Sequence, residues 1–109
     1  MIPDAVGATF AALADPTRRH VIDLLADREA VTASELARDL PITRQAVAKH
    51  LSQLASAGLV APTRQGRETR YRITPEPLED AVVWIVQAGG EWDDRLARLS
   101  AYVRDDRVA

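Results

Sequence analysis

Residues 33–57, ASELARDLPITRQAVAKHLSQLASA, decide the fold of this 109-residue chain. Thr32 stands three residues before a glutamate, which is the spacing of a helix-capping box and predicts a helix over residues 33–40. Pro41 ends this helix, because the residue before a proline is pushed away from helical torsion angles. A second helix is predicted over residues 44–57. Two helices joined by so short a turn are typical of a helix-turn-helix.

The helix of residues 44–57 has one apolar and one polar face. Thr43 can cap its start and contact a phosphate, and Gly58 suits its end. Spacings of four and three residues place three apolar side chains on the core-facing side: Val47, Leu51 and Leu54. The opposite face presents Arg44, Gln45, Ala48, Lys49 and Ser52. In a DNA major groove, arginine or lysine can donate to guanine, glutamine can pair with adenine, and alanine can contact a thymine methyl group.

A basic β-hairpin, the wing, is predicted over residues 59–73. The helical period gives way there to the alternation typical of strands, with a tip at Gln65-Gly66. The hairpin carries four arginines: Arg64, Arg67, Arg70 and Arg72. Because it directly follows the polar helix, we expect it to lie along DNA. The first three arginines are the expected contacts, and Arg67 is placed to reach a narrow minor groove.

Three further helices complete the predicted architecture. Asp4 and Asp15 are placed to cap helices over residues 4–14 and 16–26. A long helix is predicted over residues 77–104. The whole chain is therefore expected to form a single domain, mainly α-helical with a small β-hairpin. This is a winged helix-turn-helix of five helices, dimeric through its terminal helices.

The last helix carries an apolar seam with heptad spacing. Its members are Leu78, Val82, Ile85, Gly89, Trp92, Leu96, Leu99 and Val103. A seam of roughly 39 Å is too long for so small a domain to cover, so a second copy of the chain is the expected cover. Phe10 of the first helix is expected to pack beside it. Gly89-Gly90 predicts either a close crossing of two helices or a kink or break in this one.

Charge is distributed unevenly along the chain. The formal net charge is -2, but residues 43–72 hold six cationic residues and one acidic residue between two acidic flanks. A basic centre is typical of a chain that presents one face to a polyanion, although six solvated cations would give the same count. The chain has no cysteine, which excludes thiol chemistry, and no apolar run long enough for a membrane span. The expected location is the cytoplasm.

Three motifs carry a family resemblance: LADPTRR at residues 13–19, TRQAVAKHLSQLASAGLV at 43–60 and GRETRYRIT at 66–74. They resemble the ArsR/SmtB, or ArsR, family of winged helix-turn-helix transcriptional repressors, over nearly the whole chain. The resemblance implies a homodimer that binds a pseudo-palindromic operator in double-stranded DNA. The family's DNA-contacting positions fall on Gln45, Ala48 and Lys49, beside Arg44. Ala48 stands where a serine is common in the family, which favours a methyl contact in place of one hydrogen bond.

The sequence departs from the metal sensors of this family. Where such relatives have a cysteine pair in the third helix, this chain has Ala37 and Asp39. The family's other metal site uses Asp, His and Glu of the last helix, which here has carboxylates without histidine: Asp80, Glu91, Asp93 and Asp94. Such a set binds transition metals weakly, so no metal or cofactor is expected. The sequence leaves open whether an unidentified small-molecule effector binds. Three aromatic residues of the last helix can line a pocket for it or belong to the core or interface: Trp84, Trp92 and Tyr102.

Other classes of protein fit the sequence less well. An enzyme is not expected, because no serine has a histidine suited to activate it and no glycine-rich phosphate loop is present. A winged-helix module for protein partners would need an apolar face on residues 44–57, where this chain is cationic and polar. A transcriptional activator of the same fold is an alternative that the sequence leaves open.

Overall fold

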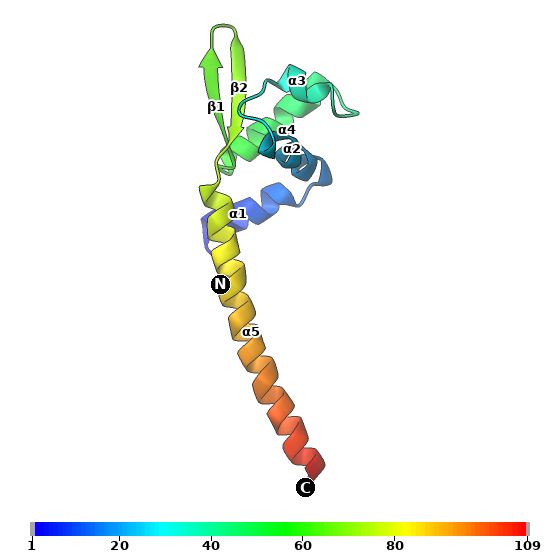
Figure 1. The fold of residues 1–109 in the computed structure, drawn as a ribbon, viewed down its shortest axis with the longest axis vertical. Helices are drawn as coiled ribbons and strands as arrows, with labels where there is room; N and C mark the ends of the chain where they lie inside the picture. The colour runs from blue at the N-terminus through cyan, green and yellow to red at the C-terminus, as the bar shows by residue number, and fades with distance from the viewer. Residues whose placement is uncertain (1, 109) are drawn as a thin grey trace.

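The computed structural model describes residues 2–108, with the side chains of residues 2–103. Over this range the elements are α1 (Asp4–Leu13), α2 (Pro16–Ala26), α3 (Ala33–Ala37), α4 (Arg44–Ser56), β1 (Val60–Gln65), β2 (Glu68–Ile73) and α5 (Glu76–Val108). This order confirms the predicted winged helix-turn-helix. Figure 1 shows one body of α1 to α4 and the hairpin, from which α5 projects away from the hairpin tip. None of the described helices is long and apolar enough to cross a membrane.

Side-chain caps fix the starts of α2 and α4. The Asp15 carboxylate accepts hydrogen bonds from the N–H groups of Thr17 (2.8 Å) and Arg18 (3.1 Å). The bond from the Arg18 N–H holds the pKa of Asp15 below its ordinary value. At α4, Thr43 Oγ1 accepts from the Ala46 N–H at 3.1 Å. Both caps confirm the sequence prediction.

One predicted cap and one predicted helix end are corrected. α1 has Pro3 at its N-cap position, and Asp4 lies in the first turn, where a negative charge favours the positive end of the helix. α3 ends at Ala37 and not at residue 40. The N–H groups of residues 38 and 39 bond to carbonyl groups three residues back, which is the tighter spacing of a 3₁₀ turn. The chain thus leaves the helix before it reaches Pro41.

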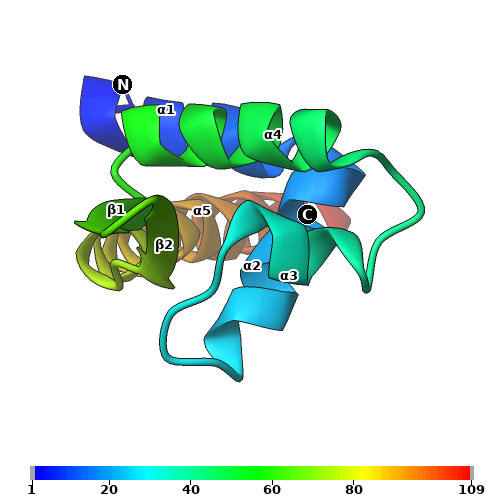
Figure 2. The same ribbon diagram turned by 90° about the horizontal axis from the view of Figure 1, so that it is seen from above.

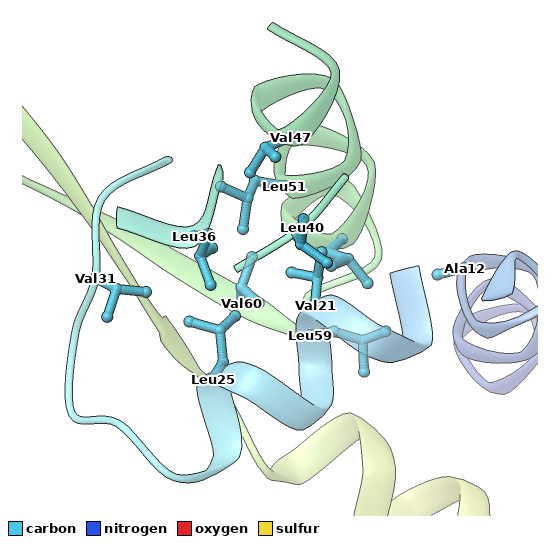
Figure 3. Packing of buried hydrophobic residues seen from close by; sticks show 11 residues of the cluster. Ala12, Val21, Leu25, Val31, Leu36, Leu40, Val47, Leu51, Leu59 and Val60 are labelled. Carbon is cyan, nitrogen blue, oxygen red and sulfur yellow. The ribbon is translucent and has the colours of Figure 1, made fainter. Parts of the chain in front are cut away.

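The hydrophobic core lies between α2, α3, α4 and the base of the hairpin (Figure 3). α4 contributes Val47, Leu51 and Leu54, whose side chains are fully buried. The other members of the cluster are Ala12, Val21, Leu25, Val31, Leu36, Leu40, Leu59 and Val60. The predicted apolar face of α4 is therefore confirmed. Because this face is fixed in the core, the opposite face of α4 looks outward.

β1 and β2 form a two-stranded antiparallel hairpin, as predicted. Its tip lies one residue further along than expected, because Gln65 still pairs with Glu68 in the ladder. The loop is Gly66-Arg67, with Gly66 at φ +64°. Glycine reaches this left-handed region without strain, and two-residue hairpin loops commonly place it first.

The base of the hairpin is tied to the loop before α3. The Val31 N–H donates to the Tyr71 carbonyl at 3.0 Å, and the Tyr71 N–H donates back to the Val31 carbonyl at 2.8 Å. These two backbone bonds form an isolated antiparallel bridge. They hold the hairpin against the helix-turn-helix without the help of side chains.

α5 is continuous through Gly89 and Gly90, which excludes a helix break there. Its first half packs on the body, where Trp84 meets Phe10 edge-on with ring centroids 5.7 Å apart. Beyond Ala88, every described side chain up to residue 103 is exposed. A Cβ atom added at either glycine would meet no other part of the described chain within 4 Å. Nothing described within the protomer therefore requires these glycines.

Candidate nucleic-acid interface

The outward face of α4 carries the side chains predicted to contact DNA. Thr43, Arg44, Gln45, Ala48, Lys49 and Ser52 are all exposed. They extend from the N-cap to the ninth residue of α4, and the helix end adds a partial positive charge beside Thr43, Arg44 and Gln45. The structure therefore brings the predicted α4 residues together on one surface.

A concavity of about 530 Å³ lies between α4, the start of α3 and the hairpin. Figure 2 looks onto this end of the molecule, with α5 receding behind it. Three arginines line it: Arg38, Arg44 and Arg67. Among the described residues, no carboxylate forms an ion pair with any of the three. Three such arginines beside an exposed helix face offer hydrogen-bond donors and positive charge to a phosphate backbone.

Arg38 is a lining residue that the sequence reasoning missed. It lies at the C-cap of α3 and is exposed. The helix-turn-helix pattern predicts DNA contacts on α4 and the hairpin, whereas Arg38 belongs to the acidic N-terminal part of the sequence. Arg38 lines the same concavity as Arg44 of α4 and Arg67 of the hairpin loop, which belong to other elements of the fold.

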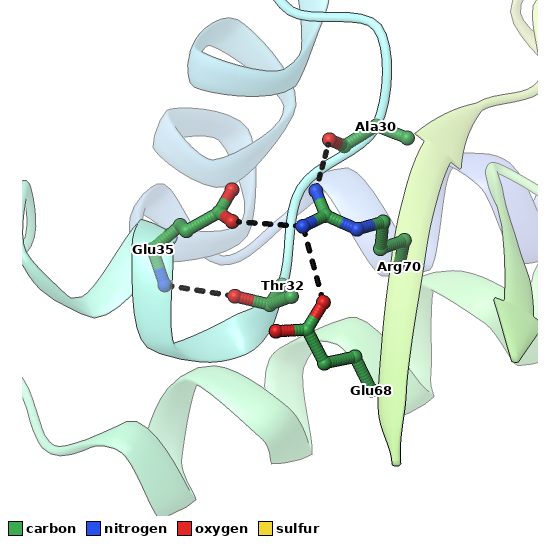
Figure 4. A network of polar contacts seen from close by, with 5 residues as sticks. All are labelled: Ala30, Thr32, Glu35, Glu68 and Arg70. Carbon is green, nitrogen blue, oxygen red and sulfur yellow. Dashed lines mark hydrogen bonds and ion pairs between the residues drawn. The ribbon is translucent and has the colours of Figure 1, made fainter. Parts of the chain in front are cut away.

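Arg70 was expected to contact DNA, but its guanidinium group points toward α3 (Figure 4). Its Nη1 donates to the Ala30 carbonyl at 3.2 Å, and its Nη2 lies 3.1 Å from Glu68 Oε2 and 3.4 Å from Glu35 Oε1. The Arg70 side chain is only 28% exposed. Thr32 caps α3 by accepting from the Glu35 N–H, while the Glu35 carboxylate turns to Arg70. Arg70 thus links the hairpin to α3.

The remaining arginines of the wing are exposed. Arg64 Nε donates to the Gly66 carbonyl at 3.3 Å, which keeps this side chain near the tip. Arg67 lies in the two-residue loop and lines the concavity. Arg72 lies on β2, nearer the base. Two of the three arginines therefore stand at the outer end of the hairpin, where a wing meets DNA.

The donor set for a metal ion is poor. Over residues 2–103, no three His, Cys, Asp or Glu side chains come together in a group that could hold one. Asp39, at a position where metal-sensing relatives have cysteine, forms an ion pair with Arg28. The carboxylates of α5 have no imidazole or thiolate beside them in the sequence, and carboxylates alone are weak ligands for transition metals.

The aromatic residues of α5 do not line one pocket within a protomer. Trp84 packs on Phe10, and Trp92 has the Arg95 guanidinium 5.6 Å from its ring centroid. Trp84, Trp92 and Tyr102 follow one another along a continuous helix at steps of about 12 and 15 Å, given 1.5 Å per residue. These distances are too large for a small effector to contact all three side chains of one chain.

A second exposed surface is the apolar seam of α5. Leu78 is partly buried against the core. Six further seam side chains are 42–59% exposed: Val82, Ile85, Trp92, Leu96, Leu99 and Val103. Apolar side chains gathered in one stripe at this exposure are typical of a surface that another chain covers.

The fold is a winged helix-turn-helix, and its α4 turns cationic and amide side chains outward next to a basic hairpin. This arrangement is typical of a DNA-binding protein. The sequence matches a family model described as a helix-turn-helix domain over residues 13–63.

The chain is 45% identical over 85 residues to the uncharacterized HTH-type transcriptional regulator YuzN of Bacillus subtilis, covering 72% of this chain and 92% of YuzN. It is 30% identical over 87 residues to the transcriptional repressor SdpR of the same species, covering 80% of this chain and 96% of SdpR. An ArsR-like transcriptional regulator from Rhodococcus sp. RHA1 has a solved structure with a TM-score of 0.78 and 41% identity, covering 87% of this chain and 89% of that one. The chain belongs to the ArsR family of winged helix-turn-helix transcriptional regulators, and it is a regulator rather than an enzyme.

Proposed function

We propose that the protein is a homodimeric transcriptional repressor that binds a pseudo-palindromic operator. Each protomer inserts α4 into the major groove of one half-site and lays the wing along the adjoining backbone or minor groove. The observation that carries the proposal is the outward face of α4, whose polar side chains are exposed beside the basic wing.

Base reading and phosphate binding are assigned to different side chains. Arg44, Gln45 and Ala48 face bases, because their donors, acceptor and methyl group match base edges in the major groove. Phosphates are contacted by Thr43, Lys49, Ser52, Arg64 and Arg67, with Arg38 added by its place in the concavity. The first set determines which operator is bound, and the second supplies most of the affinity.

The homodimer is supported by the seam of α5. Its apolar side chains remain in water in a lone protomer, and a partner's α5 would cover them. Gly89 lies on this seam, and its missing side chain lets two helices approach closely there. Phe10 joins this interface through α1, which packs beside α5 at Trp84. The interface is thus assigned to α1 and to the continuous α5.

Repression is favoured over activation by the similarity to SdpR, a protein named as a repressor. A dimer bound over a promoter blocks RNA polymerase by occupying the same DNA. In vitro transcription from a promoter that contains the selected operator tests the direction of regulation. Less transcript with added protein supports repression, and more transcript would identify an activator.

Replacing Gln45 by alanine is expected to relax base preference at one position of each half-site. Loss of a bidentate contact to a base corresponds to about 1–3 kcal/mol of discrimination. Binding to a panel of operator fragments with single base changes measures this effect. Gln87→Ala, which removes an exposed glutamine of α5 off the seam, is the matched control. Equal weakening on specific and random DNA would remove Gln45 from the base-reading role.

Operator binding is expected to be independent of metal ions. With no cysteine in the chain and no histidine on α5, micromolar free Zn²⁺ should change operator affinity by less than about twofold, a coupling below ~0.4 kcal/mol. Titrations with and without zinc, nickel or arsenite at fixed ionic strength test this. Release of DNA by one equivalent of any of them would identify a metal sensor built from other residues.

A further inference from the structure

The concavity between α4 and the wing contains acidic as well as basic groups. Glu35 and Glu68 line it together with the three arginines that have no described carboxylate partner. Two carboxylates beside the proposed path of a phosphate backbone would repel DNA, because charges within a Debye length of about 8–10 Å interact at ordinary salt. Both are held by one guanidinium group, that of Arg70.

The contacts of Arg70 separate two roles for this residue. Fixing the wing does not depend on it alone, since the backbone bridge between Val31 and Tyr71 already ties the hairpin to the loop before α3. Its distinctive contact is the shared ion pair, in which one Nη2 atom serves both carboxylates. Arg70 is also not among the residues that line the concavity. Its donors are therefore directed to protein acceptors.

We propose that Arg70 is a positioning residue for DNA binding, which holds and partly neutralises Glu35 and Glu68 so that they repel the phosphates bound at the concavity less, and which does not itself contact DNA. The proposal rests on the proposed function. Four arginines and two glutamates meet in this region, for a net charge of +2. Removing Arg70 lowers this charge to +1 and leaves both carboxylates beside the phosphate path.

A double-mutant cycle tests this role. Arg70→Gln is compared in the wild-type protein and in a Glu35→Gln/Glu68→Gln background, using an operator fragment selected with the wild-type protein. Arg70→Gln alone is expected to weaken operator binding by about tenfold, within the range for residues of one ion-pair network. In the background without the two carboxylates it should change affinity by less than about threefold, since no charge remains for it to neutralise.

The salt dependence of binding distinguishes this role from a direct DNA contact, because only a direct contact changes the slope of log K against log[salt]. If Arg70 neutralises carboxylates, Arg70→Gln leaves the slope of log K against log[salt] unchanged, because no phosphate contact is lost. A direct phosphate contact in each protomer would make the slope shallower by about 1.8. Arg70→Lys, which keeps the charge, should retain affinity to within about threefold of the wild-type protein under the proposed role.

The outcomes are distinguishable. Equal losses from Arg70→Gln in both backgrounds, or the shallower slope, would overturn the inference and leave the proposed function standing. A wild-type protein that selects no DNA would overturn both. If the Arg70→Gln protein does not fold, the triple variant Arg70→Gln/Glu35→Gln/Glu68→Gln still tests the role of Arg70, because no carboxylate of the network remains in it. Affinity close to that of Glu35→Gln/Glu68→Gln supports the role, and a further loss of tenfold or more contradicts it.

Discussion

A Leu99→Glu protein is expected to sediment as a monomer and to bind the operator about 100-fold more weakly than the wild-type protein, or worse. The substitution places a charge in the middle of an apolar seam, where a partner's α5 would have to desolvate it. A monomer presents one recognition helix, whereas an operator with two half-sites is read by two helices held about 34 Å apart. A monomer therefore loses the additional affinity that a dimer gains by binding both half-sites at once.

Sedimentation velocity and binding isotherms on the same samples check this result. Ala101→Glu is the matched control, because Ala101 is exposed on α5, lies off the seam and gains the same charge. It should remain a dimer and bind normally. Leu96→Glu should behave like Leu99→Glu. A Leu99→Glu protein that sediments as a dimer and binds the operator tightly would show that the interface lies elsewhere.

The affinity of the dimer for its operator is expected to fall by about four orders of magnitude between about 50 and 200 mM salt. Each protomer has four cationic phosphate contacts, which gives eight in the dimer: Arg38, Lys49, Arg64 and Arg67. Each neutralised phosphate releases condensed counterions and contributes about -0.9 to the slope of log K against log[salt]. Random DNA should show a slope of similar size, since the wing and the helix start meet phosphates of any sequence.

Single substitutions separate the contributions. Arg67→Gln should reduce the magnitude of the slope by about 1.8, from one contact in each protomer. Arg98→Gln, which removes the same charge from the outer half of α5, should leave the slope unchanged. Binding measured over a series of salt concentrations gives the slope for each variant and for the wild-type protein. A slope near zero for the wild-type protein would contradict a phosphate-binding surface in this region.

The sequence was sufficient to predict the elements whose signals are local. The cap at Thr43 and the buried side of α4 depend on short spacings within one segment, and the structure confirms them. The seam of α5 could be predicted for the same reason, as a repeat along a single helix. Its exposure in the protomer agrees with an unfilled interface, and its occupancy by a partner stays a prediction.

Features that depend on the meeting of separate segments could not be predicted. Arg70 is among the expected DNA contacts because its neighbours in sequence are basic, but two of its partners, Ala30 and Glu35, lie 40 and 35 residues earlier. Arg38 was overlooked for the opposite reason, since its surroundings in sequence are acidic. α3 also ends three residues earlier than expected, through a 3₁₀ turn. For the two arginines, tertiary packing outweighed a local rule.

The exposed outer half of α5 has a consequence for the dose response of regulation. In the proposed homodimer the apolar surface of this seam is covered only when two chains meet, so part of the stability of the molecule would depend on protein concentration. Below the dissociation constant of the dimer, the amount of dimer rises with the square of the amount of chain, and operator occupancy rises with it. A twofold change in synthesis would then change occupancy about fourfold at low levels. Under the proposed function, repression would therefore rise more steeply than in proportion to the amount of chain.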